Sequence, residues 1–193
     1  MKEGSPGLIW ENRLIFQRLV EDCVGSCELV TPQLLAAPFY RGAFGSLIIP
    51  TGFANKDYSR VLPALRATQT RIERFIRSGG ELLVYGGGGA VPDCYDWLPF
   101  SVRYHFEYGP RKITIRKEAE CTALFEGYDL NAFECDGYFT DYEGDPVAVT
   151  SEGHPVLIEE QIGSGRIILT TAHEYPSRAF LTSFCSCKME TFF

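Results

Sequence analysis

The 193-residue chain lacks long hydrophobic runs: no stretch approaches the roughly 18 consecutive apolar residues that a membrane span requires. Its first residues, MKEGSPGLIWEN, also lack the apolar core of roughly 7–15 residues that marks a secretory signal peptide. From these two absences we expect a cytoplasmic protein that makes no contact with a membrane.

A basic surface is missing as well, because 18 Lys and Arg stand against 25 Asp and Glu, for a formal net charge of −7. Proteins that bind nucleic acids need a basic face for the phosphates, and no basic stripe with interleaved aromatic residues occurs here. We therefore expect no nucleic-acid partner.

Motifs for metals and cofactors are absent too. Cys23 and Cys27, and likewise Cys185 and Cys187, lack a second ligand pair at zinc spacing. The seven scattered cysteines are instead typical of small buried side chains in a reducing compartment. We expect no metal and no cofactor.

What the sequence does contain is an alternation of short apolar runs and amphipathic stretches. A proline after Thr31 is typical of a helix start, and residues 59–77 carry an apolar stripe at helical spacing. Strands that alternate with helices in this way predict parallel βαβ units with right-handed crossovers. The predicted strands are residues 7–10, 27–30, 47–50 and 82–85, and Asn12 is the predicted cap of the first helix.

The second half of the chain has a different pattern. Residues 101–108, 112–116 and 146–150 alternate or run apolar between turns, which predicts antiparallel strands. A glycine-rich turn at residues 163–165 lies between two further apolar runs and indicates a hairpin. The acidic residues 134–145 lack the ligand spacing of a calcium loop, so we interpret them as a solvated turn region.

The most distinctive stretch is residues 79–92, which read GGELLVYGGGGAVP. An apolar run leads into four glycines, and a turn at the carboxyl end of a central strand is where ligands and nucleophiles usually sit in α/β proteins. Its backbone amides could cradle an anion or a carbonyl oxygen. Alternatively, the turn needs glycine only for steric reasons. No Lys-Ser/Thr pair follows, so it is not a P-loop.

Three segments in this order resemble the class I glutamine amidotransferase-like superfamily, and within it the N-terminal part of some biotin–protein ligases. Residues 47–53 (LIIPTGF) are similar to the strand and PGG loop of that superfamily, residues 72–88 to its helix and nucleophile elbow, and residues 163–174 to its final core strand and His-Glu loop. The resemblance implies an α/β, flavodoxin-like three-layer sandwich with a mostly parallel central sheet and an antiparallel extension in the C-terminal half. We expect one domain over residues 1–193, with residues from about 180 onward as a C-terminal tail.

Active members of this superfamily carry a cysteine nucleophile in a G-x-C-x-G elbow, where the thiolate is stabilised by its surroundings. Counted from Gly79-Gly80, that position falls on Gly86, and residues 84–90 contain no Cys, Ser or Thr. The nearest thiol, Cys94, lies eight residues further on. We therefore expect no glutaminase activity by the cysteine mechanism.

The resemblance also implies a pocket that contains His173 and Glu174, although the superfamily places its glutamate two positions after the histidine rather than directly after it. Backbone groups of Gly52, Gly86 and Gly87 are the expected ligand contacts. The leading hypothesis is a non-catalytic protein that binds a small polar or anionic ligand, or that serves as a regulatory domain, a homodimer or a partner subunit. The alternative is a hydrolase in which His173 activates water, Glu174 orients His173, and the glycine amides hold an oxyanion.

Overall fold

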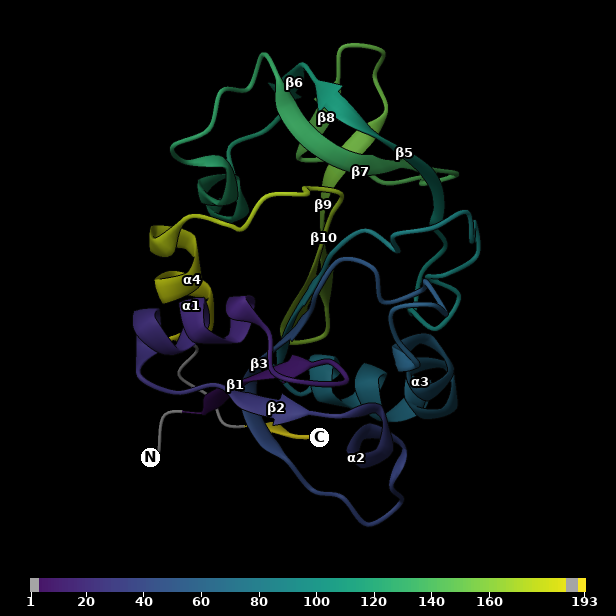
Figure 1. The fold of residues 1–193 in the computed structure, drawn as a ribbon, viewed down its shortest axis with the longest axis vertical. Helices are drawn as coiled ribbons and strands as arrows, with labels where there is room; N and C mark the ends of the chain where they lie inside the picture. Colours follow the sequence, from purple (N-terminus) through teal and green to yellow (C-terminus); the bar gives the residue numbers. More distant parts are fainter. Residues whose placement is uncertain (1–3, 187–190) are drawn as a thin grey trace.

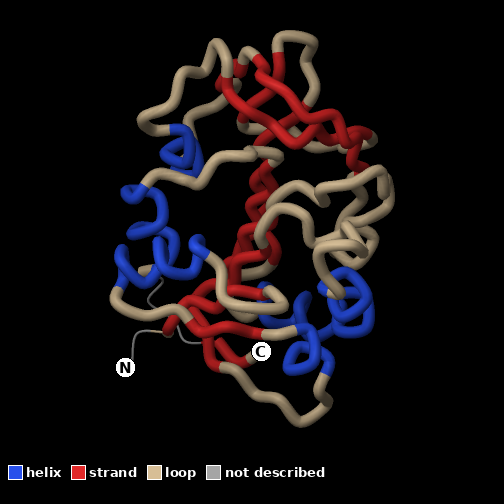
Figure 2. The backbone as a smooth tube through the Cα atoms, in the orientation of Figure 1, coloured by secondary structure: helices blue, strands red, loops and turns tan. Residues whose placement is uncertain are grey.

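A mixed β-sheet runs through the middle of the protein in the computed structural model, which describes residues 4–186 and 191–193 (Figures 1 and 2). Five neighbouring strands pair in parallel, and three further strands continue the sheet in antiparallel pairing. In sheet order the parallel strands are β2 (Glu28–Val30), β1 (Ser5–Ile9), β3 (Ala43–Ile49), β4 (Glu81–Val84) and β10 (Gly165–Thr170), followed by β9 (Pro155–Ile162), β8 (Ala148–Thr150) and β6 (Ile113–Ile115). This arrangement confirms the predicted flavodoxin-like α/β fold and its antiparallel extension.

Helices cover both faces of the parallel strands. Helices α1 (Ile15–Val24) and α4 (Arg178–Cys185) lie together on one side of the sheet, and α2 (Pro32–Ala36) and α3 (Val61–Arg77) lie on the other (Figure 1). Strands buried on both faces are expected to be continuously apolar, as the fully buried Ile48, Leu83 and Ile168 illustrate. No helix among the described residues is long and apolar enough to cross a membrane.

Of the two helix N-terminal caps predicted from the sequence, the structure confirms one. Thr31 caps α2 as predicted, because its Oγ1 accepts a hydrogen bond from the N–H of Leu34 at 3.3 Å. The prediction that Asn12 caps α1 is wrong: the helix begins only at Ile15, its N-cap residue is Leu14, and no side chain of the described residues caps it. The residues between β1 and α1 instead turn across the end of the sheet, where Trp10 and Leu14 line a pocket.

A second, two-stranded antiparallel sheet lies beyond the carboxyl edge of the parallel strands, in the upper part of Figure 1. It consists of β5 (Arg103–Arg111) and β7 (Phe133–Thr140). The prediction of a solvated turn is wrong for residues 134–140, which belong to β7. Phe133, Cys135 and Phe139 alternate along this strand and are buried, so burial rather than charge determines its conformation.

The described residues of the predicted C-terminal tail pack against the rest of the fold. Helix α4 buries Phe180, Leu181 and Phe184, and β11 (Thr191–Phe192) pairs antiparallel with the start of β3. The ring of Phe193 lies under the guanidinium of Arg71, 4.8 Å from its Cζ. Residue 187, one of the two tail cysteines, lies outside the described residues.

Candidate functional site

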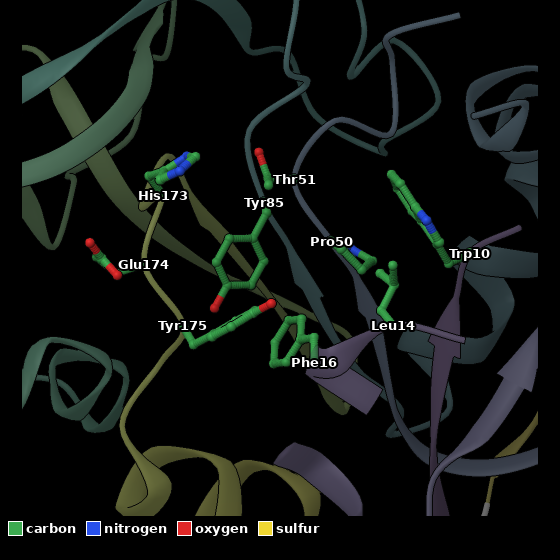
Figure 3. Close-up of a pocket in the computed structure, with 9 residues that line it drawn as sticks. All are labelled: Trp10, Leu14, Phe16, Pro50, Thr51, Tyr85, His173, Glu174 and Tyr175. Atoms are coloured by element: carbon green, nitrogen blue, oxygen red, sulfur yellow. The ribbon is translucent and has the colours of Figure 1, made fainter. Parts of the chain in front are cut away.

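Four parallel strands end at the same edge of the sheet, and the residues that follow them line one pocket of about 210 Å³ (Figure 3). This edge is where ligands bind in open α/β sheets. The loops after β1, β3, β4 and β10 and the start of α1 contribute to it. Its lining residues are Trp10, Leu14, Phe16, Pro50, Thr51, Tyr85, His173, Glu174 and Tyr175. The pocket thus contains both predicted side chains, His173 and Glu174.

His173 is held at the pocket by β7. Its backbone N–H donates to the carbonyl of Glu134 at 3.0 Å, and its Nδ1 lies 2.7 Å from Oδ1 of Asp136. The imidazole is 47% exposed, and the ring of Tyr108 packs against it edge-on at 5.0 Å. Since Asp136 engages Nδ1, the Nε2 atom is the ring nitrogen left for a ligand or a water molecule.

Asp136 is the residue that sequence reasoning missed. Its other carboxylate oxygen accepts a short hydrogen bond from the hydroxyl of Thr51, its carbonyl accepts one from Tyr104 Oη at 2.9 Å, and its N–H donates to Thr171 at 2.8 Å. Burial, and then the nearby Asp136 charge, raise the pKa of Tyr104, so this hydroxyl stays a donor. The buried carboxylate therefore joins β7 to the loops after β3 and β10, and its charge is met by hydrogen bonds.

The carboxylate that orients His173 is Asp136 and not Glu174, which differs from the sequence-based expectation. Ala172 forms a bridge to Cys135 of β7, and the chain bends at His173 and Glu174 as it enters the pocket. Both side chains line the pocket (Figure 3). The carboxylate within hydrogen-bond distance of the His173 ring is that of Asp136, 2.7 Å from Nδ1.

The glycine turn lies behind the pocket wall rather than in it. The N–H of Gly52 donates to the carbonyl of Gly86 at 2.9 Å, so this amide is already engaged. A Cβ added to Gly86 would lie 3.1 Å from Asp136 Cβ, and one added to Gly87 would lie 2.8 Å from Cys94 Sγ. Gly52, Gly86 and Gly87 are buried and do not line the pocket. The geometry thus favours the steric explanation of the glycines over an open cradle of amides.

The other two histidines lie elsewhere, on the second sheet and its neighbouring turn. The rings of His105 and His154 both stack on Tyr138, at centroid distances of 4.8 Å and 4.2 Å. Among residues 4–186 and 191–193, no cluster of three or more His, Cys, Asp or Glu side chains is arranged to hold a metal ion.

Cys94, the thiol nearest to Gly86 along the sequence, is not accessible as a nucleophile. Cys94 is fully buried, and burial raises its pKa to about 12. We predict that iodoacetamide at pH 8 alkylates Cys94 about a thousandfold more slowly in the native protein than in urea, because only the thiolate reacts. Mass spectrometry of the Cys94 peptide measures both rates. Comparable rates in the two states would contradict this assignment.

Comparison with known proteins gives a fold and no closer relationship. No protein-family model matches the chain, and no curated protein matches its sequence. Solved structures do match it. A protein from Thermoplasma acidophilum described as one component of a GMP synthase aligns with a TM-score of 0.61 and 12% identity over 96% of both chains. A cytoplasmic protein from Salmonella typhimurium LT2 aligns with a TM-score of 0.55 and 13% identity, over 94% of this chain and 97% of that one.

A β-galactosidase from Bacillus circulans sp. alkalophilus also aligns, with a TM-score of 0.54 and 12% identity over 96% of this chain. The chain spans only 30% of the length of that β-galactosidase. Identities this low show a shared fold alone, and that fold is the flavodoxin-like α/β sandwich.

Proposed function

We propose that this chain is a member of the class I glutamine amidotransferase-like superfamily that binds a small polar ligand and forms no covalent intermediate through a cysteine. The observation that carries the proposal is the pocket at the carboxyl edge of the sheet, which holds an imidazole oriented by a buried carboxylate but no thiol. The fold shared with the Thermoplasma protein supports the superfamily. The Salmonella protein of the same fold, described as cytoplasmic, supports a cytoplasmic location.

The hydroxyl of Thr51, which lies in the pocket wall next to Asp136, does not replace the missing nucleophile. A serine- or threonine-type nucleophile needs its hydroxyl within hydrogen-bond reach of the base. The hydroxyl of Thr51 instead contacts the carboxylate of Asp136 and lies 3.3 Å from the carbonyl of Gly86. Within the described part of the chain, His173 therefore has no hydroxyl partner of the kind that covalent hydrolases use.

The size of the pocket limits the ligand. Pockets for drug-sized ligands typically measure about 300–1,000 Å³, whereas this one measures about 210 Å³. Its apolar wall and its few polar groups suit a compact molecule with one polar head. The ligand we propose is therefore a small metabolite rather than a nucleotide or a peptide.

A second candidate function follows from the Asp136–His173 pair. A buried carboxylate on Nδ1 is the arrangement that fixes a histidine as a general base, so His173 could activate water for hydrolysis. In this version Asp136 takes the orienting role that the sequence suggested for Glu174. The amide of Gly52 is not free to hold an oxyanion, which makes this candidate the weaker one.

Ammonia release from glutamine tests the leading proposal. We predict that the purified protein releases ammonia no faster than its His173→Ala variant, because no thiolate is present to attack the amide. Release that a single substitution abolishes would contradict the proposal. Hydrolysis of p-nitrophenyl acetate tests the second candidate: loss of activity in His173→Ala, but not in the exposed control His105→Ala, would favour it.

A further inference from the structure

The charges around the pocket are unfavourable for an anion. None of the nine lining residues is Lys or Arg, and one of them, Glu174, carries a carboxylate. The one basic side chain in the lining is that of His173, and it is already paired with the buried Asp136. A carboxylate-bearing ligand such as an amino acid would therefore find no free cation in this wall, and it would face Glu174.

The other walls of the pocket are aromatic. Phe16, Tyr85 and Tyr175 contribute rings that are inclined to one another, and Trp10 contributes a further ring on the opposite side of the pocket (Figure 3). The ring centroid of Phe16 lies 5.7 Å from that of Tyr85, with an angle of 84° between the ring planes. It lies 5.1 Å from the ring centroid of Tyr175, with an angle of 40° between the planes. Ring faces attract cations through their quadrupoles, and groups of aromatic rings are a known means of recognising quaternary ammonium ligands.

One buried polar atom in this aromatic wall has no partner. The hydroxyl of Tyr85 makes no hydrogen bond within the described part of the chain, although the side chain is only 2% exposed. Figure 3 shows it directed toward the side of the pocket where Glu174 and Tyr175 lie. Buried hydroxyl groups are normally satisfied, so an unpaired one that lines a pocket points to a ligand that supplies the missing hydrogen bond.

We infer that the ligand of this pocket is a small organic cation, an amine with an apolar or aromatic body. The inference rests on the proposed function, in which this pocket is the ligand site. The ammonium group would donate to the hydroxyl of Tyr85 and face the carboxylate of Glu174, while the body of the ligand would pack against Trp10 and Phe16. This choice replaces the anionic ligand expected from the glycine turn.

Three probes with one body and different charges test the inference: benzylamine, benzyl alcohol and benzoate, each titrated calorimetrically into the full chain at pH 7. We expect benzylamine, which is protonated at this pH, to bind roughly tenfold more tightly than benzyl alcohol, and benzoate to bind more weakly than either. Equal affinities, or a preference for benzoate, would overturn the inference.

Two variants locate the effect. Glu174→Gln removes the charge and keeps the shape, and Tyr85→Phe removes only the hydroxyl. Each is expected to weaken benzylamine binding about fivefold or more and to leave benzyl alcohol binding nearly unchanged. Glu118→Gln, which removes an exposed carboxylate outside the pocket, is the matched control and should have no effect.

The failure of this inference is distinguishable from failure of the proposed function. If benzoate or benzyl alcohol binds best, or if none of the three probes binds, the cation inference is overturned while the glutamine assay still decides the proposed function. If the protein releases ammonia from glutamine, the proposed function fails whatever the probes do.

Discussion

Replacing Gly88 by alanine is expected to lower the free energy of unfolding by about 3 kcal/mol or more. Gly88 has φ of 71°, a conformation that costs an L-residue roughly 1–2 kcal/mol. An added Cβ would also overlap the Cα of Gly52 and lie 2.9 Å from its nitrogen. Both obstacles are backbone atoms, and the amide of Gly52 is hydrogen-bonded to Gly86, so they cannot easily move apart.

Urea unfolding followed by circular dichroism measures this loss. The neighbouring glycine supplies the control: a Cβ on Gly89 would lie 3.9 Å from Asn55 Cβ, an ordinary contact, so Gly89→Ala should change stability by less than about 0.5 kcal/mol. If both substitutions cost the same, or if Gly88→Ala costs less than about 1 kcal/mol, the glycine turn is not the tightly packed support that we describe.

Replacing Asp136 by alanine is expected to destabilise the protein by about 2 kcal/mol and to release the ring of His173. The buried carboxylate contacts the hydroxyl of Thr51 and the imidazole of His173, and hydrogen bonds to a charged group contribute about 1.5–3 kcal/mol each. The expected net loss is smaller than their sum, because the half-exposed imidazole can turn to water.

Nitrogen NMR of the imidazole separates a positioning role from a purely structural one. In the wild type, Nδ1 of His173 should carry the proton that is donated to Asp136, and in Asp136→Ala the two neutral tautomers should exchange. Asp57→Ala, which removes an exposed aspartate, is the control and should leave both the stability and the imidazole spectrum unchanged. An unchanged His173 spectrum in Asp136→Ala would show that Asp136 does not orient the ring.

The parallel core could be predicted from the sequence because its signals are local. Continuous apolar runs such as residues 47–49 and 82–84 mark strands buried on both faces, and Thr31 before a proline marks a helix start. His173 and Glu174 reach the pocket because they follow β10, the last of the parallel strands, and the position of a strand end is also predictable from the order of elements.

The role of Asp136 could not be predicted, because it depends on contacts between segments far apart in the sequence. Phe133, Cys135 and Phe139 alternate, which is a signal for a strand, but nothing in the neighbouring residues indicates that this strand pairs with the loop after β10. The amide of Gly52 is a similar case. Its hydrogen bond to Gly86 forms only because the loops after β3 and β4 lie against each other, and this contact takes the Gly52 amide away from a ligand.

The central claim is that the aromatic pocket is the ligand site and that the glycine turn behind it is a packed support. The two tryptophans of the chain provide a direct test, because Trp10 lines the pocket whereas the indole N–H of Trp97 is buried and donates to the carbonyl of Cys94 at 2.9 Å. We predict that benzylamine shifts the indole N–H signal of Trp10 in the ¹H–¹⁵N spectrum and leaves the Trp97 indole and the amides of Gly88 and Gly89 in place. Shifts of the Gly88 and Gly89 amides without a shift of the Trp10 indole would contradict the account.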